Sequence, residues 1–93
     1  MFIERIKQLR VERQLPLRKL AAALDIDSAT YWKIERGERR AKREHIPIIA
    51  KILQTAQEEL LTLWLADQVV EVVADEKKIA RKVLDMAKEK INQ

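Results

Sequence analysis

The chain has no cysteine, a single glycine and two prolines among its 93 residues. The lack of cysteine excludes disulfides, thiolate metal sites and cysteine nucleophiles. A fold built from β-strands needs more turn residues than one glycine and two prolines supply, so we expect an all-α fold. Because there is only one histidine as well, we expect neither a metal site nor a cofactor.

Long apolar runs are also missing. Charged residues interrupt every apolar stretch well before it reaches the length of a membrane span. The first residues, Met1 to Arg5, lack the apolar core of a signal peptide. We therefore expect a soluble, cytoplasmic protein with no membrane partner. The length suits one compact domain, which we place at residues 1–65, followed by a C-terminal helical extension over residues 66–93.

Positive charge is concentrated towards the front of the chain. Residues 1–55 contain thirteen Lys and Arg against seven Asp and Glu, whereas residues 56–93 contain six against eight. A basic surface of this kind favours a polyanionic partner such as DNA, and the acidic remainder indicates a different task.

Apolar residues spaced three and four apart predict six helices. The predicted ranges are 2–13, 17–24, 28–36, 45–54, 57–74 and 76–91. Asp27 is a suitable N-cap for the third helix, and Gly37 is expected to end it in the left-handed conformation. Pro47 lies in the first turn of the fourth helix without losing a hydrogen bond, whereas a start near Arg43 would produce a kink. Residues 75–76 resemble the cap and first turn of the last helix.

Residues 20–37 read as two short helices joined by a tight turn, with a basic run over residues 38–43 behind them. This is the pattern of a helix-turn-helix, whose second helix fits the major groove of DNA. Further residues extend the pattern to both sides. They are Arg5, Ile6, Leu9 and Arg10; Leu20 and Ala21; Ile26; Ile34, Glu35, Arg36 and Gly37; and Glu59, Leu60 and Leu61.

On these positions the chain resembles the lambda repressor-like (Cro/XRE-type) helix-turn-helix family. The resemblance implies a compact five-helix DNA-binding domain, here with an additional C-terminal helix. It further implies a transcription regulator, a repressor or an autoregulator, that binds a palindromic operator in double-stranded DNA as a homodimer, without a small-molecule ligand. The run over residues 35–42 also resembles regulators encoded beside restriction-modification genes. Pro16 and Leu17 depart from the family, which commonly has Ser or Thr followed by a DNA-contacting Gln.

A helix that starts after Asp27 presents four side chains on its outer face as candidates for reading base edges. They are Ser28, Ala29, Trp32 and Lys33. The alternative is that they merely face solvent. Trp32 has a further alternative, packing sideways into the basic loop or the fourth helix. Tyr31 points towards the core, with its hydroxyl available to a phosphate.

Polar and basic residues around this face are candidates for phosphate contacts, which fix register without reading sequence. They are Thr30, Arg36, Arg39, Arg40, Lys42 and Arg43. The alternative is a solvated basic surface. The family resemblance implies that Arg10 and Glu35 form a structural ion pair instead of touching DNA. His45 is expected at a helix start or near a phosphate.

The fifth helix is apolar on more than one face, and the last helix carries an apolar stripe. We expect both to form a dimer interface. The residues assigned to it are Leu61, Trp64, Leu65, Val69, Val72, Ile79, Val83 and Met86. The alternative for the last helix is packing on its own domain. A second function remains open, an antitoxin-like or adaptor module whose C-terminal helices bind a heterologous protein. Nucleophile, metal and cofactor signatures are missing, so we do not expect an enzyme.

Overall fold

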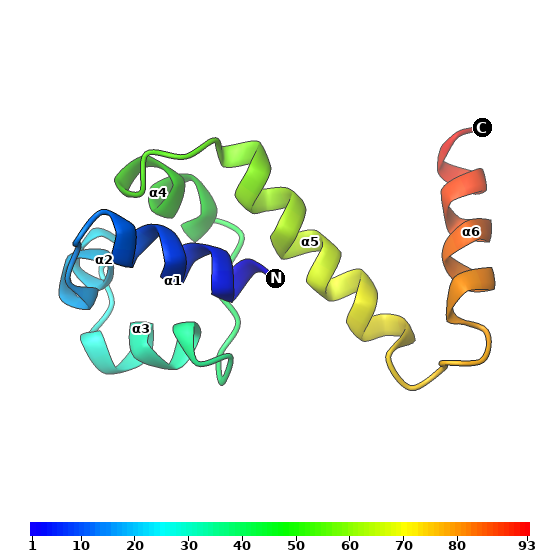
Figure 1. Cartoon of the computed structure of the whole chain (residues 1–93), viewed down its shortest axis with the longest axis horizontal. Coiled ribbons are helices and arrows are strands. Elements are labelled where there is room, and N and C mark those ends of the chain that lie inside the picture. Colours follow the sequence, from blue (N-terminus) through cyan, green and yellow to red (C-terminus); the bar gives the residue numbers. More distant parts are fainter.

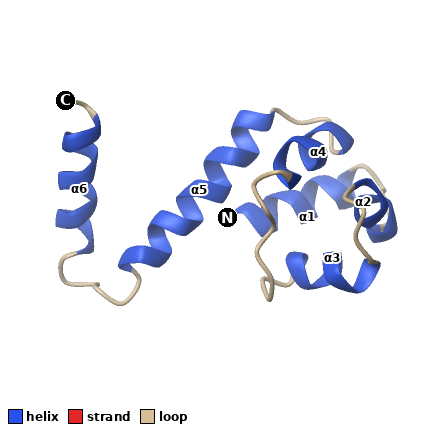
Figure 2. Cartoon of the chain, turned by 180° about the vertical axis from the view of Figure 1, so that it is seen from behind, coloured by secondary structure: helices blue, strands red, loops and turns tan.

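The computed structural model describes residues 1–93 as six α-helices without a strand, which confirms the all-α fold (Figures 1 and 2). The helices are α1 (Phe2–Glu12), α2 (Leu17–Ala23), α3 (Ser28–Glu35), α4 (His45–Ile52), α5 (Gln57–Val73) and α6 (Ala80–Ile91). None of them combines the length and the apolar character that crossing a membrane requires.

The core lies among α1 to α4 and the first half of α5. Each helix contributes an apolar stripe at three and four residue spacing, as Phe2, Ile6 and Leu9 do on α1. The side chains that are completely buried are Tyr31, Ile6, Leu20, Ile34, Ile46, Ile49, Leu53 and Leu60. The two helices of the helix-turn-helix, α2 and α3, pack against each other, and α1 supports α3 from behind.

The helices α1 to α4 all end in the same way. In each, one residue adopts a left-handed backbone, with φ of 53° at Gln14, 56° at Asp25, 78° at Gly37 and 54° at Gln54. The amide of that residue donates to the carbonyl three residues before it, and the amide of the next residue donates to the carbonyl five residues before itself. This is the Schellman arrangement, which satisfies carbonyls at the helix end. The expected left-handed Gly37 is confirmed, and three non-glycine residues do the same.

The helix α5 is continuous across residue 65, where we had placed the domain boundary. Its first half belongs to the five-helix body. Leu61 and Trp64 pack against the core cluster of their own domain, and the Trp64 indole N–H donates to the Ala41 carbonyl at 2.9 Å. Both side chains are thus partly covered within one chain, and their assignment to the dimer surface stays a prediction.

The last helix begins at Ala80, four residues later than predicted. Residues 75–76 lie in the connecting segment, and Ile79 occupies the N-cap position without a side-chain hydrogen bond. No residue of α6 is buried, and both views show it standing apart from the five-helix body (Figures 1 and 2). The alternative that α6 packs on its own domain is therefore wrong for this structure.

Candidate nucleic-acid interface

The helix α3 is fixed at its start by the side chain of Asp27. The Oδ1 atom of Asp27 accepts the backbone N–H of Thr30 at 2.7 Å, which confirms the predicted N-cap. Hydrogen bonding from Thr30 also holds the pKa of the Asp27 carboxyl below its ordinary value. Behind the helix, Tyr31 and Ile34 are buried in the core. The cap and these two anchors decide which face of α3 points outwards.

The end of α3 is tied to α1 by an ion pair between Arg10 and Glu35. The guanidinium donates through Nε to Glu35 Oε2 at 2.8 Å and through Nη2 to Oε1 at 3.0 Å. Its Nη1 atom donates to the Leu15 carbonyl at 3.0 Å. Only 15% of the Arg10 side chain and 5% of the Glu35 side chain are exposed. The bond to Glu35 raises the pKa of Arg10, and neither residue is available to DNA.

The outer face of α3 carries the four predicted base-reading residues, Ser28, Ala29, Trp32 and Lys33, all of which are exposed. Trp32 is 46% exposed, and the Arg36 guanidinium lies over its ring, 4.3 Å from the centroid. Trp32 is therefore not packed into the basic loop or α4. Arg36 also pairs with Glu38 through Nε and Oε2 at 3.3 Å. The stacked pair forms one flat edge of the face, with the Arg36 charge shared between the Trp32 ring and Glu38.

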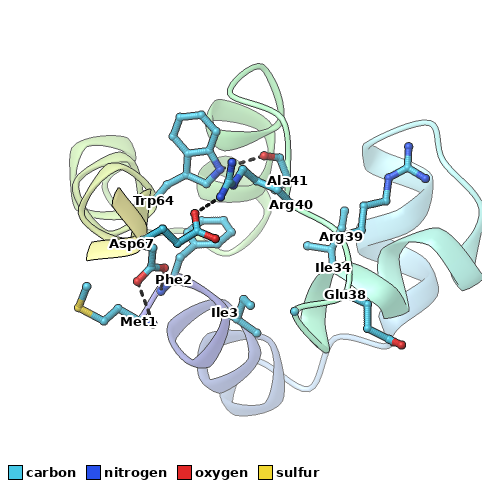
Figure 3. Close-up of a pocket in the computed structure, with 12 residues that line it drawn as sticks. Met1, Phe2, Ile3, Ile34, Glu38, Arg39, Arg40, Ala41, Trp64 and Asp67 are labelled. Carbon is cyan, nitrogen blue, oxygen red and sulfur yellow. Dashed lines mark hydrogen bonds and ion pairs between the residues drawn. The ribbon is translucent and has the colours of Figure 1, made fainter. Parts of the chain in front are cut away.

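The basic loop over residues 38–44 is anchored to the body through Ala41, which is 3% exposed and accepts the hydrogen bond from Trp64 (Figure 3). Arg39, Lys42 and Arg43 are exposed without an ion-pair partner.

Arg40, by contrast, pairs with Glu71 of α5. Both side chains of this pair are more than half exposed, so the phosphate contact of Arg40 stays a prediction and requires exchange of the Glu71 partner. Thr30 is half-buried beside this surface.

Two other predicted residues have defined surroundings. His45 is partly buried at the start of α4, and its Nδ1 atom accepts the Lys42 backbone N–H at 3.3 Å. Burial lowers the pKa of this histidine. The hydroxyl of Tyr31 is buried and has no hydrogen-bond partner, and burial raises its pKa. The expectation that this hydroxyl reaches a phosphate is therefore wrong.

The residues that the sequence did not reveal lie on α5. Glu71 binds Arg40, and Asp67 accepts the Phe2 backbone N–H at 3.0 Å. Arg40 and Phe2, the partners of these two residues, are far from them in the sequence, so no local sequence pattern indicates either contact. Ala41 is different, because an alanine in the middle of five charged residues is a signal that the loop turns inwards at this point.

An open cavity of about 410 Å³ lies between the start of α1, the basic loop and α5 (Figure 3). Its lining combines apolar side chains with Arg39, Arg40, Asp67 and Glu71. Three of these charged groups are engaged within the protein, Arg40 with Glu71 and Asp67 with the start of α1. No group of His, Cys, Asp or Glu residues in the chain has an arrangement that could hold a metal ion.

Comparison with known protein families matches residues 3–63 to the family described as helix-turn-helix domain. Comparison with curated proteins finds no match, and comparison with solved structures finds none either. The matched region ends within α5 and contains the capped and braced helix α3 together with the basic loop. The chain belongs to the helix-turn-helix domain family.

Proposed function

We propose that the chain is a sequence-specific DNA-binding transcription regulator, a repressor or an autoregulator, in which α3 reads the major groove. The observation that carries the proposal is the outer face of α3. It exposes two polar side chains, one small one and the aromatic ring of Trp32, while the opposite face is locked by Asp27, Tyr31 and the Arg10–Glu35 pair. A rigid helix with a free polar face meets the geometric requirement for base readout.

Each exposed residue on this face has a base edge that suits it. The Lys33 ammonium donates to the guanine acceptors O6 and N7, the Ser28 hydroxyl both donates and accepts, and the Ala29 methyl suits a thymine methyl. Trp32, with Arg36 stacked on it, would contact the sugars and phosphate at the edge of the groove. Around them, Arg39, Lys42 and Arg43 supply phosphate contacts.

Phosphate contacts also explain how the chain compensates for its unusual helix α2. Leu17 packs against the core and cannot donate to a phosphate. The next two residues, Arg18 and Lys19, are exposed on α2, the helix that crosses the DNA backbone in this class of domain. We propose that they take over the contact.

The proposal extends to a homodimer on a palindromic operator, as in the lambda repressor-like (XRE) family and the restriction-modification controllers that the sequence resembles. Two copies of α3 would then lie about 34 Å apart, one helical turn of DNA. It assigns no enzymatic activity, and because regulators of that family are bacterial and phage proteins, it includes a cytoplasmic location. The uncovered end of α5 and α6 supports a second candidate, an antitoxin-like or adaptor module that binds a heterologous protein.

The test is selection of bound sequences from a random DNA pool, followed by titration of the selected and scrambled DNA with variants. Lys33→Ala should weaken binding to the selected sequence by about 1–3 kcal/mol and relax preference at one position. Lys51→Ala is the matched control, since Lys51 is an exposed lysine on α4, across α1 from α3 (Figure 1). Equal losses on both DNAs for Lys33→Ala would refute the readout, and a pool without enrichment would refute the function.

A further inference from the structure

The second half of α5 leaves the five-helix body with an apolar surface uncovered. Residues 69–72 are all exposed, although Arg40 pairs with Glu71 and the next residue, Val73, is buried. Three of the four are valines, exposed by 48%, 52% and 79% at positions 69, 70 and 72. Valine is a weak helix former because its branched side chain loses rotamer freedom. A projecting helix made of such residues needs packing to persist in water.

The helix α6 depends on packing against a partner even more than the end of α5 does. It has twelve residues, no buried side chain and no side-chain N-cap, and isolated helices of this length are marginal in water. Ile79, Val83 and Met86 form one exposed apolar stripe, and Leu84 and Ile91 lie beside it. The radius of gyration is 15.3 Å, compared with about 12 Å for a compact domain of this length. The C-terminal helices thus extend from the body without a partner.

The charges beside these two apolar surfaces are opposite. Residues 57–76 contain six Asp and Glu and no Lys or Arg, whereas residues 77–93 contain six Lys and Arg and two Asp and Glu. Within the first segment, Glu59, Asp67 and Glu71 are already bound by α1 or the basic loop. The acids without an ion-pair partner are Glu58, Asp75 and Glu76.

The unpaired acids lie at the two ends of an exposed apolar stripe. Leu65, Val69 and Val72 are spaced four and three residues apart, so they share one face of α5. Glu58 lies on that face near the start of the helix, and residues 75–76 follow its end. The α6 stripe has the inverse arrangement, with two lysines before it at positions 77 and 78 and Lys90 on the same face near its end.

We propose that α6 of one copy packs on the exposed α5 stripe of a second copy, and that the second copy returns the contact. This inference rests on the proposed function, because the homodimer proposed there supplies the partner, a second copy of this chain. The α5 stripe has acidic groups at both ends, and the α6 stripe has basic groups at both ends. Opposite charges therefore meet whether the two helices pack parallel or antiparallel. The reciprocal exchange covers both apolar surfaces at once and closes a two-fold dimer without leaving an edge.

Charge reversal tests the pairing without touching the DNA-reading face. One variant reverses the acids (Glu58→Lys, Asp75→Lys, Glu76→Lys), and the other reverses the bases (Lys77→Glu, Lys78→Glu, Lys90→Glu). In each variant alone, both exchanged contacts bring like charges together, so its dimer dissociation constant should rise at least about tenfold by sedimentation equilibrium. In an equimolar mixture every contact pairs opposite charges, and a one-to-one heterodimer should form. Added salt should reduce these differences.

Neutral substitutions test the apolar part. Val72→Asn and Val83→Asn, which keep a similar helix propensity, should each weaken the dimer about tenfold or more. Lys88→Gln, on the face of α6 opposite the stripe, should not. None of these residues belongs to the core cluster, and an unchanged thermal transition of the body verifies folding.

Three results would overturn the proposal. They are a wild-type chain that stays monomeric over the concentration series, a dimer indifferent to all four variants, and charge-reversed chains that fail to associate when mixed. A monomer that still enriches one sequence from the DNA pool would overturn the exchange alone and leave the DNA-binding function standing. A wild-type chain that dimerises only after a different protein is added would assign these helices to the adaptor function instead.

Discussion

Breaking the Arg10–Glu35 pair should be the most damaging single change outside the apolar core. Arg10→Met removes both bonds to Glu35 and the bond to the Leu15 carbonyl. The carboxylate that remains is 5% exposed, so water cannot replace the lost guanidinium. Removing one partner of a buried pair costs about 3–5 kcal/mol. For a domain of this size, a loss of about 3 kcal/mol lowers Tm by at least about 12 °C.

The assay is thermal and urea unfolding followed by far-UV circular dichroism, with two controls. Arg13→Met removes an exposed pair whose Nη1–Oε2 distance to Glu12 is 3.8 Å, and it should cost no more than about 1 kcal/mol. The double variant Arg10→Met, Glu35→Met removes both charges and should be more stable than Arg10→Met alone, because no buried charge is left unpaired. The reasoning is refuted if Arg10→Met costs no more than Arg13→Met, or if the two single losses simply add in the double variant.

Four further substitutions have defined outcomes. Gly37→Ala should lose about 1–2 kcal/mol in urea unfolding because φ is 78°, whereas Gln54→Gly relieves a left-handed glutamine and should gain up to about 1 kcal/mol. The lowered pKa of His45 means that the unfolded chain takes up protons more readily, so stability should fall as pH drops below 6.5; His45→Asn should remove this part of the pH dependence. Trp64→Phe leaves a carbonyl of the basic loop unbonded and should cost about 1 kcal/mol, with faster amide exchange in that loop.

The sequence predicted the parts of the fold that depend on neighbours along the chain. The starts of α1 to α5 agree with apolar spacing and local caps, as Asp27 illustrates. The left-handed residues at the helix ends were only partly predictable in this way. A left-handed glycine is predictable from its conformational freedom, but Gln14 and Gln54 adopt the same backbone with no such preference. The Schellman hydrogen bonds and the packing of the next segment impose it.

Contacts between distant segments were predictable only where the family resemblance supplied them, as for Arg10 and Glu35. The Arg40–Glu71 and Trp64–Ala41 contacts join residues 31 and 23 positions apart. The type of each residue does not indicate which distant residue it will contact. The start of α6 was misplaced for a related reason. Acidic residues near a helix start are favourable, yet those at positions 75–76 also follow the end of α5, and the local sequence does not distinguish the two roles.

The continuity of α5 gives the proposed dimer a physical means of setting the spacing of its operator. The first half of this helix binds α1 through Glu59, which pairs with Arg5, and the basic loop through Trp64, while Glu71 in the second half pairs with Arg40. Its second half carries the uncovered stripe. Seventeen residues of unbroken helix span about 25 Å, so one rigid helix joins the body that holds α3 to the stripe. A flexible connection at residue 65 would leave the distance between the two α3 helices undefined, whereas the continuous helix transmits the dimer geometry to the DNA-reading face.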